Sequence, residues 1–110
     1  MLNALSYAYY YYSAYYLSLM AELKWLEDLL ALMEEDSFTK AAARRHVTQP
    51  AFSRRIRQLE NWLGVKLVDS TRKPIRILPL TLEHESKIRS LIHDFYHLRN
   101  SLQDLSLIHI

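Results

Sequence analysis

The stretch from Ser37 to Glu60 constrains the fold most, because it carries two helical patterns with almost no room between them. In its second half and just beyond, apolar residues step by four, three and four positions and so share one stripe of a helix. These residues are Phe52, Ile56, Leu59 and Leu63. Only about four residues, 46–49, remain for the turn before this helix. The spacing therefore predicts a helix-turn-helix.

Flanking residues mark where these helices begin and end. Thr48 is placed as the N-cap of the second helix, and Pro50 follows in the first turn, where a missing N–H costs nothing. Gly64, the only glycine of the chain, falls where a left-handed residue ends a helix, and Val65 is expected to supply the hydrophobic contact of a Schellman stop. Ser37 can cap the first helix.

A further helix is predicted before Ser37. Its apolar residues have the i, i+3, i+4, i+7 spacing of one buried face; they are Leu26, Leu29, Leu30 and Met33. The alanines at 41–43 are small enough for another helix to approach closely. We therefore expect three helices to share one core.

The face of the second helix that the core does not use is polar and basic. It holds Gln49, Pro50, Ser53, Arg54 and Arg57, with Arg55 to one side. The formal net charge of the chain is only +2, but residues 40–76 carry ten Lys or Arg against two acids, a local net charge of +8. Residues 22–36 and 81–110 carry −5 and −1. A solvated basic face is the alternative, but together with the capped helix pair this charge favours phosphate binding.

Two short aliphatic segments follow Gly64. Residues 65–69 and 74–78 flank a polar loop, 70–73, and predict a β-hairpin with Pro74 at the start of its strand or on an edge. A hairpin after a helix-turn-helix is a wing. Arg72, Lys73 and Arg76 are then placed to reach the DNA backbone or the minor groove beside the second helix.

Four runs of the chain form a specific pattern. They are Leu-Glu-Asp-Leu-Leu-Ala-Leu at 26–32, Ser-Phe-Thr-Lys-Ala-Ala at 37–42, Val-Thr-Gln-Pro-Ala-Phe-Ser-Arg-Arg-Ile-Arg-Gln-Leu-Glu at 47–60 and Leu-Gly-Val-Lys-Leu at 63–67. From about Leu23 to Pro79 the chain resembles the N-terminal DNA-binding domain of LysR-type transcriptional regulators. The resemblance implies a mainly α fold, a three-helix winged helix-turn-helix with a two-stranded wing, followed by a long linker helix.

The same resemblance implies a function and its residues. In that family the domain binds an operator as part of a dimer, and the start of the recognition helix enters the major groove. Carried over by position, base-edge and nearby phosphate contacts fall on Thr48, Gln49, Pro50, Ser53 and Arg54, with backbone contacts on Arg57, Arg72 and Arg76. Gln can pair with adenine and Arg with guanine, whereas phosphate contacts add affinity without sequence choice.

The chain departs from the family pattern at two places. Where the family has Leu-Phe-x-Arg after the glycine, this chain has Leu-Val-Asp-Ser at 67–70, and we expect Arg72 to replace the missing arginine. Where the family has Leu-Thr-Pro-Ala-Gly, the chain has Ile-Leu-Pro-Leu-Thr at 77–81. We therefore expect the next helix to begin at Thr81.

That next helix carries a heptad seam. Its apolar residues are spaced three, four, three, four and three; they are Ile88, Leu91, Phe95, Leu98, Leu102 and Leu105. Family members dimerise through the linker helix at this place, and pairing with a second copy would bury the stripe. The alternative is that the helix packs on its own domain.

The remaining segments bear on domain division and exclude some functions. Residues 1–19 carry no charge and are rich in tyrosine, so we expect neither a signal peptide nor a membrane span. They are expected to be non-native sequence upstream of a start at Met20, the alternative being an amphipathic segment that packs on the domain. The expected division is 1–19, a winged domain at 20–79 and a linker helix at 80–110, whose last residues, 105–110, resemble translated adaptor sequence.

Several site classes are not expected. The chain has no cysteine, which excludes disulfides and thiolate metal sites and fits a cytoplasmic protein. His93 and His97 are an i, i+4 pair without a third ligand, and one glycine cannot make a phosphate loop. We expect no enzyme activity, metal or cofactor. We expect the two-lobed effector domain of the family to be missing from this sequence, so no small-molecule site is expected either.

The sequence thus predicts a DNA-binding fragment of a transcription regulator that binds double-stranded DNA, acting as a homodimer. Two alternatives share the same fold. One is an interaction module whose heptad helix forms inactive heterodimers with full-length relatives. The other is a truncated product without function.

Overall fold

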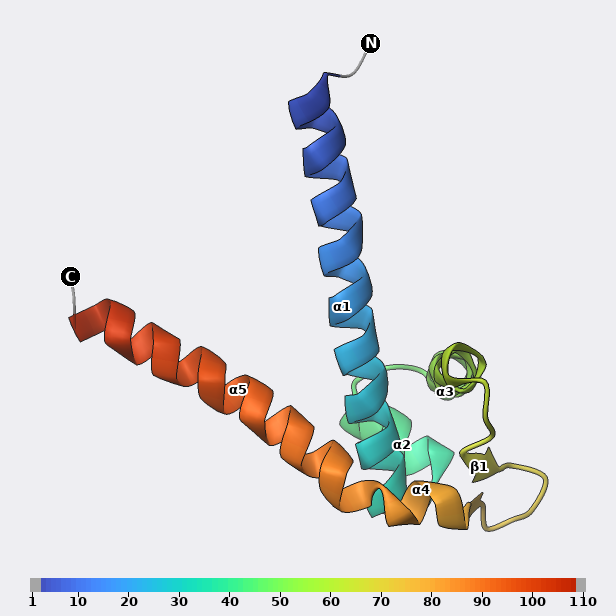
Figure 1. Cartoon of the computed structure of the whole chain (residues 1–110). Helices are drawn as coiled ribbons and strands as arrows, with labels where there is room; N and C mark the ends of the chain where they lie inside the picture. The colour runs from blue at the N-terminus through green and yellow to red at the C-terminus, as the bar shows by residue number, and fades with distance from the viewer. Residues whose placement is uncertain (1–2, 109–110) are drawn as a thin grey trace.

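The computed structural model describes the backbone of residues 3–108 and the side chains of residues 3–6 and 21–104. The elements follow in the order α1 (Ala4–Glu35), α2 (Phe38–Arg44), α3 (Gln49–Leu63), β1 (Val68–Asp69), β2 (Arg76–Ile77), α4 (Pro79–Glu83) and α5 (Glu85–Ile108) (Figure 1). The predicted mainly helical winged helix-turn-helix with a long last helix is confirmed. The side chains of the tyrosine run at 7–16 and of residues 105–110 lie outside the described residues.

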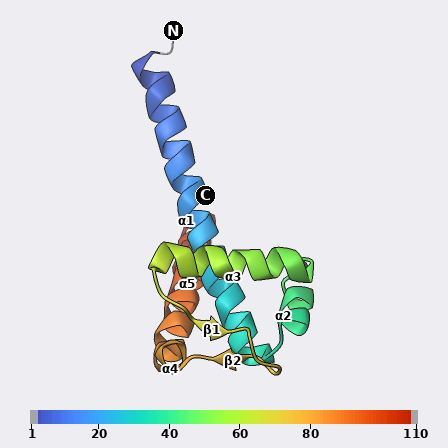
Figure 2. The same ribbon diagram turned by 90° about the vertical axis from the view of Figure 1, so that its right-hand side faces the viewer.

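The core forms where the C-terminal part of α1 meets α2 and α3. Figure 2 shows α3 lying across α1, with α2 to one side. Leu29, Leu32 and Phe52 are at most 1% exposed. The predicted buried face of α1 was partly wrong, because Leu26 and Leu30 are only half-buried. The buried face is instead turned toward Leu32, on the side from which α2 and α3 approach α1.

The helix-turn-helix is built from α2, a turn at residues 45–48 and α3. The caps are as predicted: the Ser37 Oγ accepts the Lys40 N–H at 3.2 Å, and the Thr48 Oγ1 accepts the Ala51 N–H at 3.3 Å. The predicted turn at 46–49 begins and ends one residue too late, because α3 already starts at Gln49. His46 bends the chain with a left-handed φ of 60°.

The apolar stripe of α3 is buried as predicted over most of its length. Phe52, Ile56 and Leu59 are at most 2% exposed, whereas Leu63, at the end of the helix, is 43% exposed. Gly64 has a φ of 75°, and the N–H groups of Gly64 and Val65 both donate to the Glu60 carbonyl, at 2.8 and 3.2 Å. The Val65 bond is the 6→1 bond of the predicted Schellman stop, and the Gly64 bond is the 5→1 bond of an αL cap. The hydrophobic contact predicted for Val65 is not seen, because Val65 is 43% exposed.

The wing, residues 68–77, is shorter in its strands than predicted. Val68 pairs with Ile77 and Asp69 with Arg76 in an antiparallel ladder of two residues per strand. The loop between them spans residues 70–75 and contains Pro74, which therefore does not begin a strand. Proline has no N–H to donate to a ladder, so pairing starts only beyond it.

Two buried polar side chains that the sequence did not reveal hold the wing in place. The Glu60 carboxylate accepts the N–H groups of Leu67 and Val68, at 2.8 and 3.4 Å. The Thr81 hydroxyl donates to the Leu67 carbonyl at 2.7 Å. The strand that leads into the wing is thus bound on one side by α3 and on the other by α4.

The junction into the last helix differs from the prediction that it begins at Thr81. The short helix α4 begins at Pro79, where the fixed φ of proline suits a first turn, and α5 begins separately at Glu85. Thr81 lies inside α4 with its hydroxyl engaged to Leu67.

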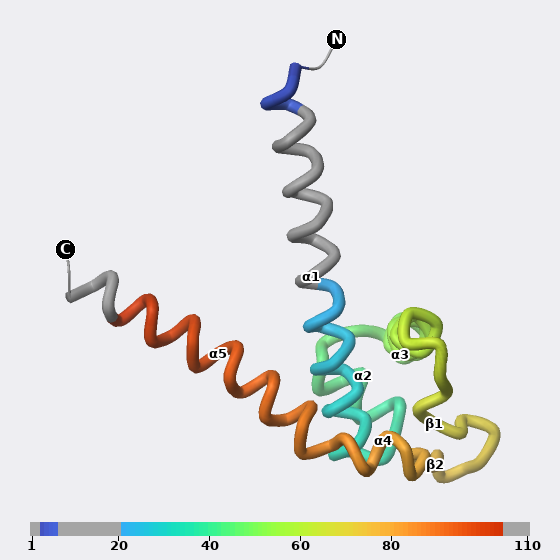
Figure 3. Tube along the Cα trace, in the orientation of Figure 1, coloured from blue at the N-terminus to red at the C-terminus, as the bar shows by residue number. Residues whose placement is uncertain are grey.

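Helix α5 leaves the domain beside α1, as the trace in Figure 3 shows. At its start Ile88 packs against the core. Polar contacts also join α5 to α1: Arg89 Nη1 donates to Glu34 Oε1 at 2.8 Å, and the Tyr96 hydroxyl donates to Glu27 Oε1.

Candidate nucleic-acid interface

The outer face of α3 carries the residues that the sequence predicted there. Gln49, Pro50, Arg54 and Arg57 are exposed and Ser53 is half-buried. The side chains of Arg54 and Arg57 form no hydrogen bond or ion pair with any other residue in the described part of the chain. Two cations without partners on one helical face are available to an external anion.

Thr48 stands at the start of this face. Its Oγ1 accepts the Ala51 N–H, which is the capping role predicted for it. The hydroxyl proton is still available for donation, since the cap uses the oxygen only as an acceptor.

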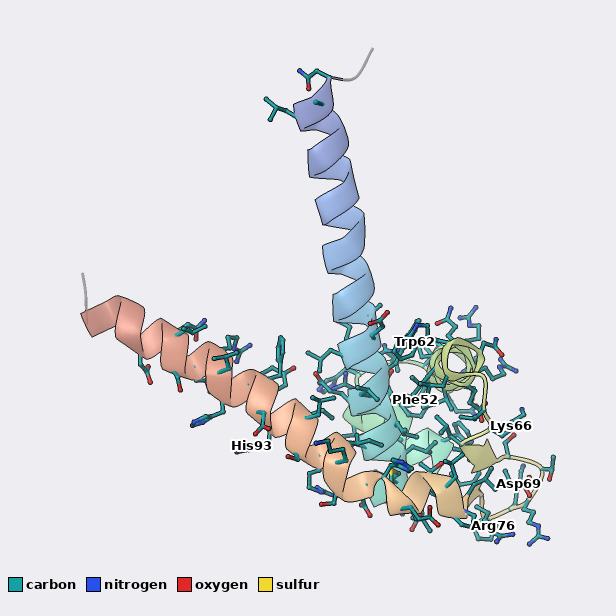
Figure 4. The ribbon with its side chains drawn as sticks, in the orientation of Figure 1. Phe52, Trp62, Lys66, Asp69, Arg76 and His93 are labelled. Atoms are coloured by element: carbon teal, nitrogen blue, oxygen red, sulfur yellow. The ribbon has the colours of Figure 1, made fainter. Side chains whose placement is uncertain are left out.

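The wing contributes further cations. Arg72 is largely exposed and lies 3.7 Å from the Asp69 carboxylate, measured from Nε to Oδ2, while Arg76 is exposed on β2 opposite Asp69. Figure 4 places Asp69 and Arg76 together at the wing, with Lys66 nearby. Hydrogen bonds from Thr71, aided by the charges of Arg72 and Arg76, lower the pKa of the Asp69 carboxyl. Asp69 therefore stays ionised among the wing cations.

A groove of about 630 Å³ separates the recognition helix from the wing. Its α3 side is lined by Gln49, Ser53 and Arg57, and its wing side by Arg72 and Lys73. The structure thus brings five predicted residues together around one groove. The other four, Thr48, Pro50, Arg54 and Arg76, do not line it.

Sequence reasoning missed a cluster of charged residues behind α3. Asp28 of α1 is 0% exposed, and its carboxylate accepts three hydrogen bonds: from Arg45 Nε at 2.7 Å, and from Arg55 Nε and Nη2 at 2.7 and 2.8 Å. Arg45 Nη1 also donates to Glu27 Oε2 at 3.0 Å. Burial lowers the pKa of Arg45, but its bonds to Asp28 and the charges of Asp28 and Glu27 raise it overall.

This cluster changes the interpretation of the local charge. Arg45 and Arg55 are neutralised by α1, and Arg44 pairs with Glu34 and Glu35. Three of the ten basic residues in 40–76 are therefore bound to the acidic helix. No signal for this cluster was available in the sequence, because the side of α1 that carries Asp28 and Leu32 is not the face predicted to be buried.

The described residues hold no group of three or more His, Cys, Asp or Glu that could bind a metal ion. His93 and His97 stack with ring centroids 5.8 Å apart on α5, and Figure 4 shows His93 away from the wing. Within residues 3–108 no helix has both the length and the apolar character needed to span a bilayer.

A capped helix pair, a basic outer face on its second helix and a hairpin beside it define a winged helix-turn-helix domain. The family described as bacterial regulatory helix-turn-helix protein, lysR family, matches residues 23–83. The chain belongs to this family.

Curated relatives of this chain are HTH-type transcriptional regulators. The HTH-type transcriptional regulator YjiE of Escherichia coli K12 is 44% identical over 71 residues, covering 64% of this chain and 23% of the relative. The HTH-type transcriptional regulator BenM of Acinetobacter baylyi is 41% identical over 58 residues, covering 53% of this chain and 19% of the relative. The chain thus spans about a quarter of the length of these relatives, or less.

Solved structures share the fold. Vibrio fischeri DarR in complex with DNA, described as an LTTR family member, has a TM-score of 0.74 and 43% identity, covering 78% of this chain and 30% of that chain. The complex of BenM_DBD with catB site 1 DNA has a TM-score of 0.74 and 28% identity, covering 80% of this chain and 95% of that chain. Both structures contain DNA.

Proposed function

We propose that this protein is a DNA-binding transcription regulator that reads an operator with α3 in the major groove and the wing on the flanking backbone. The observation that carries the proposal is the pair of unpartnered arginines, Arg54 and Arg57, on the exposed face of α3 beside the cationic wing. The DNA complexes of DarR and BenM support it, because their DNA-bound domains share this fold.

Each side chain has a distinct role in this proposal. Gln49 and Arg54 reach base edges, where Gln suits adenine and Arg suits guanine. Arg57 and Arg72, on the two sides of the groove, bind the phosphates of the strand that runs between them. Thr48, Pro50 and Ser53 bring the start of the helix close to the duplex, and Arg76 contacts the backbone beside the wing.

The test uses a duplex that the 110-residue chain enriches from a random-sequence library, with a mixed-sequence duplex of the same length for comparison. Fluorescence anisotropy should give binding that weakens steeply with salt, and Arg54→Ala should weaken binding to the enriched duplex by about tenfold or more. Lys87→Ala, which removes an exposed cation from α5, is the matched control and should change little. The proposal would be overturned if the chain enriched no duplex, or if its affinity did not depend on the salt concentration.

We further propose that two copies pair through the seam on α5. Leu91, Phe95, Leu98 and Leu102 are 44–59% exposed on one stripe, so a second copy would remove a continuous apolar surface from water. Ile88 contributes less because it packs on its own core, and the side chain of Leu105 lies outside the described residues.

Analytical sedimentation tests the pairing. A protein concentration of roughly tens of micromolar is high enough to populate a weak helix-mediated dimer. The wild-type chain should sediment as a dimer, and the double substitution Leu98→Glu, Leu102→Glu should give a monomer. Gln103→Glu, a matched change next to Leu102 on an exposed position, should leave the dimer intact. A wild-type chain that stays monomeric excludes the pairing.

With this function we propose a DNA-binding winged domain at residues 20–79 and a dimerising linker helix at residues 80–110. We propose the cytoplasm as the compartment, because bacterial operator DNA is there. No small-molecule effector site is assigned to this chain.

A further inference from the structure

A continuous chain of hydrogen bonds runs from α5 to the recognition helix. The Tyr96 hydroxyl donates to Glu27 Oε1, and Arg45 Nη1 donates to Glu27 Oε2 at 3.0 Å. Arg45 Nε then donates to Asp28 Oδ1, whose carboxylate also binds Arg55 of α3. We call these five residues the relay: Tyr96, Glu27, Arg45, Asp28 and Arg55.

The relay is shielded from solvent and balanced in charge. The side chain of Asp28 is 0% exposed, and those of Glu27, Arg45 and Arg55 are 18%, 23% and 26% exposed. Two carboxylates face two guanidinium groups, so the cluster has no net charge. In such partly desolvated surroundings hydrogen bonds between charged groups are strong and depend closely on geometry.

The far end of the relay fixes the recognition helix in two ways. Arg55 binds Asp28 through both Nε and Nη2, which sets the rotation of α3 about its own axis. Arg45 belongs to the turn before α3 and sets where the helix starts. Arg54, the residue beside Arg55, faces outward, so rotation of α3 would move it directly.

The near end of the relay depends on where α5 lies. Tyr96 reaches Glu27 from α5, and Arg99 stacks over the Tyr96 ring, with its guanidinium carbon 4.8 Å from the ring centroid. The bond to Glu27, together with burial, raises the pKa of the Tyr96 phenol. A change in the position of α5 relative to α1 would therefore break or strain the first bond of the relay.

A second contact between α5 and α1 does not reach the recognition helix. Arg89 binds Glu34, which binds Arg44 at the end of α2, and the Arg44 side chain is 43% exposed. This contact joins the same two helices without touching Arg45, Asp28 or Arg55. It provides a matched comparison for the relay.

We propose that the relay makes Glu27 and Tyr96 positioning residues for DNA reading, by coupling the placement of α5 to that of α3. The proposal rests on the proposed function for its effect on DNA binding, but the coupling itself is a property of the free protein. Neither Glu27 nor Tyr96 lies on the outer face of α3 or lines the groove beside the wing.

The first test removes only the hydroxyl group, with Tyr96→Phe in the 110-residue chain. Binding to the enriched duplex should weaken about fivefold, the scale of one ordinary hydrogen bond, with little change for the mixed-sequence duplex. Arg89→Gln should leave the ratio of the two affinities unchanged. Equal weakening for both duplexes, or no weakening at all, would overturn the proposal.

A double-substitution cycle separates coupling from general destabilisation. In an Arg45→Gln background both routes from Glu27 to α3 are already cut, so adding Tyr96→Phe should have no further effect on the affinity ratio. If the two effects add instead, Tyr96 acts independently of Arg45 and the relay is refuted.

A third measurement needs no DNA, so it distinguishes failure of the relay from failure of the proposed function. The NMR resonance of the Arg55 side-chain Nε–H should shift on Tyr96→Phe and stay in place on Arg89→Gln. If the Arg55 resonance does not shift on Tyr96→Phe, the coupling is refuted even if DNA binding is established. Conversely, a chain that enriches no duplex but shows the shift retains the relay and loses only its role in reading.

Discussion

The arginines of the helix-turn-helix fall into two groups that differ in their surroundings and not in their chemistry. Arg45 and Arg55, the clamped arginines, are bound by the buried carboxylate of Asp28. Arg54 and Arg57, the free arginines, are exposed and have no partner among the described residues. Arg54 and Arg55 are neighbours in the chain, and the rotation of about 100° between successive helix residues separates the structural role of Arg55 from the reading role proposed for Arg54.

The difference shows that a local charge count overstates the surface available to a nucleic acid. The net charge of +8 at residues 40–76 includes cations that form ion pairs with the acidic side chains of α1. Residues 22–36 carry a net charge of −5, and their carboxylates are the partners of these cations. Folding joins the two segments and leaves only part of the positive charge facing outward.

The largest expected effect comes from removing the clamp. Asp28→Asn leaves two partly buried guanidinium groups without their carboxylate and should lower the free energy of unfolding by about 2–4 kcal/mol. Urea unfolding followed by circular dichroism measures this. Asp94→Asn, in which the original carboxylate side chain is 75% exposed, is the control and should be neutral. A stable Asp28→Asn variant would remove the distinction between clamped and free arginines.

The same comparison can be made between two neighbouring residues. Arg55→Gln should lower the free energy of unfolding by about 1–3 kcal/mol, because charged hydrogen bonds to Asp28 are lost. Arg54→Gln should stay within about 0.5 kcal/mol of wild type in stability. Parallel urea titrations of the two variants test this, and equal losses of stability would contradict it.

A smaller loss of stability is expected at the wing. The side chains of Glu60 and Thr81 bind the backbone of Leu67 and so hold the wing in place. Thr81→Val keeps the shape and removes the hydroxyl that donates to the Leu67 carbonyl, so it should cost about 1 kcal/mol. Thermal or urea unfolding gives the value. Thr39→Val, at an exposed position of α2, is the control. A neutral Thr81→Val would mean that the Leu78 N–H alone satisfies this carbonyl.

The smallest effect is expected for arginines paired on the surface. The hydrogen bond from Arg44, with help from Arg89, lowers the pKa of Glu34 despite some burial. A carboxyl with a lowered pKa stabilises the fold above its unfolded pKa, and this contribution is lost as the pH falls through the folded pKa. Unfolding measured from pH 5 downward should show a loss below about 1 kcal/mol that Glu34→Gln abolishes. An unchanged pH profile in Glu34→Gln would contradict this.

Features that depend on neighbouring residues could be predicted from the sequence. The caps at Ser37 and Thr48 and the stop at Gly64 follow from local chemistry, and the stripe of Phe52, Ile56 and Leu59 follows from helical periodicity. The outer face of α3 followed in turn, because residues on the other side of a buried stripe have to be exposed.

Features that depend on distant residues could not be predicted. Asp28 and Arg55 are 27 positions apart, and no rule of spacing pairs them. The hydroxyl of Thr81 was interpreted as a helix start, because its partner, the Leu67 carbonyl, is defined only by the folded wing. The strands were predicted too long for a similar reason: aliphatic residues near the wing pack on the core without pairing, as Ile75 does.

Glu60 has a consequence for the operator itself. Its carbonyl ends α3 and its carboxylate binds the chain entering the wing, so the two elements proposed to contact DNA are fixed to one residue. The base pairs read by α3 and the phosphates touched by the wing would then keep a constant separation. Inserting a single base pair between them should remove one set of contacts entirely, and no bending of the protein would restore it.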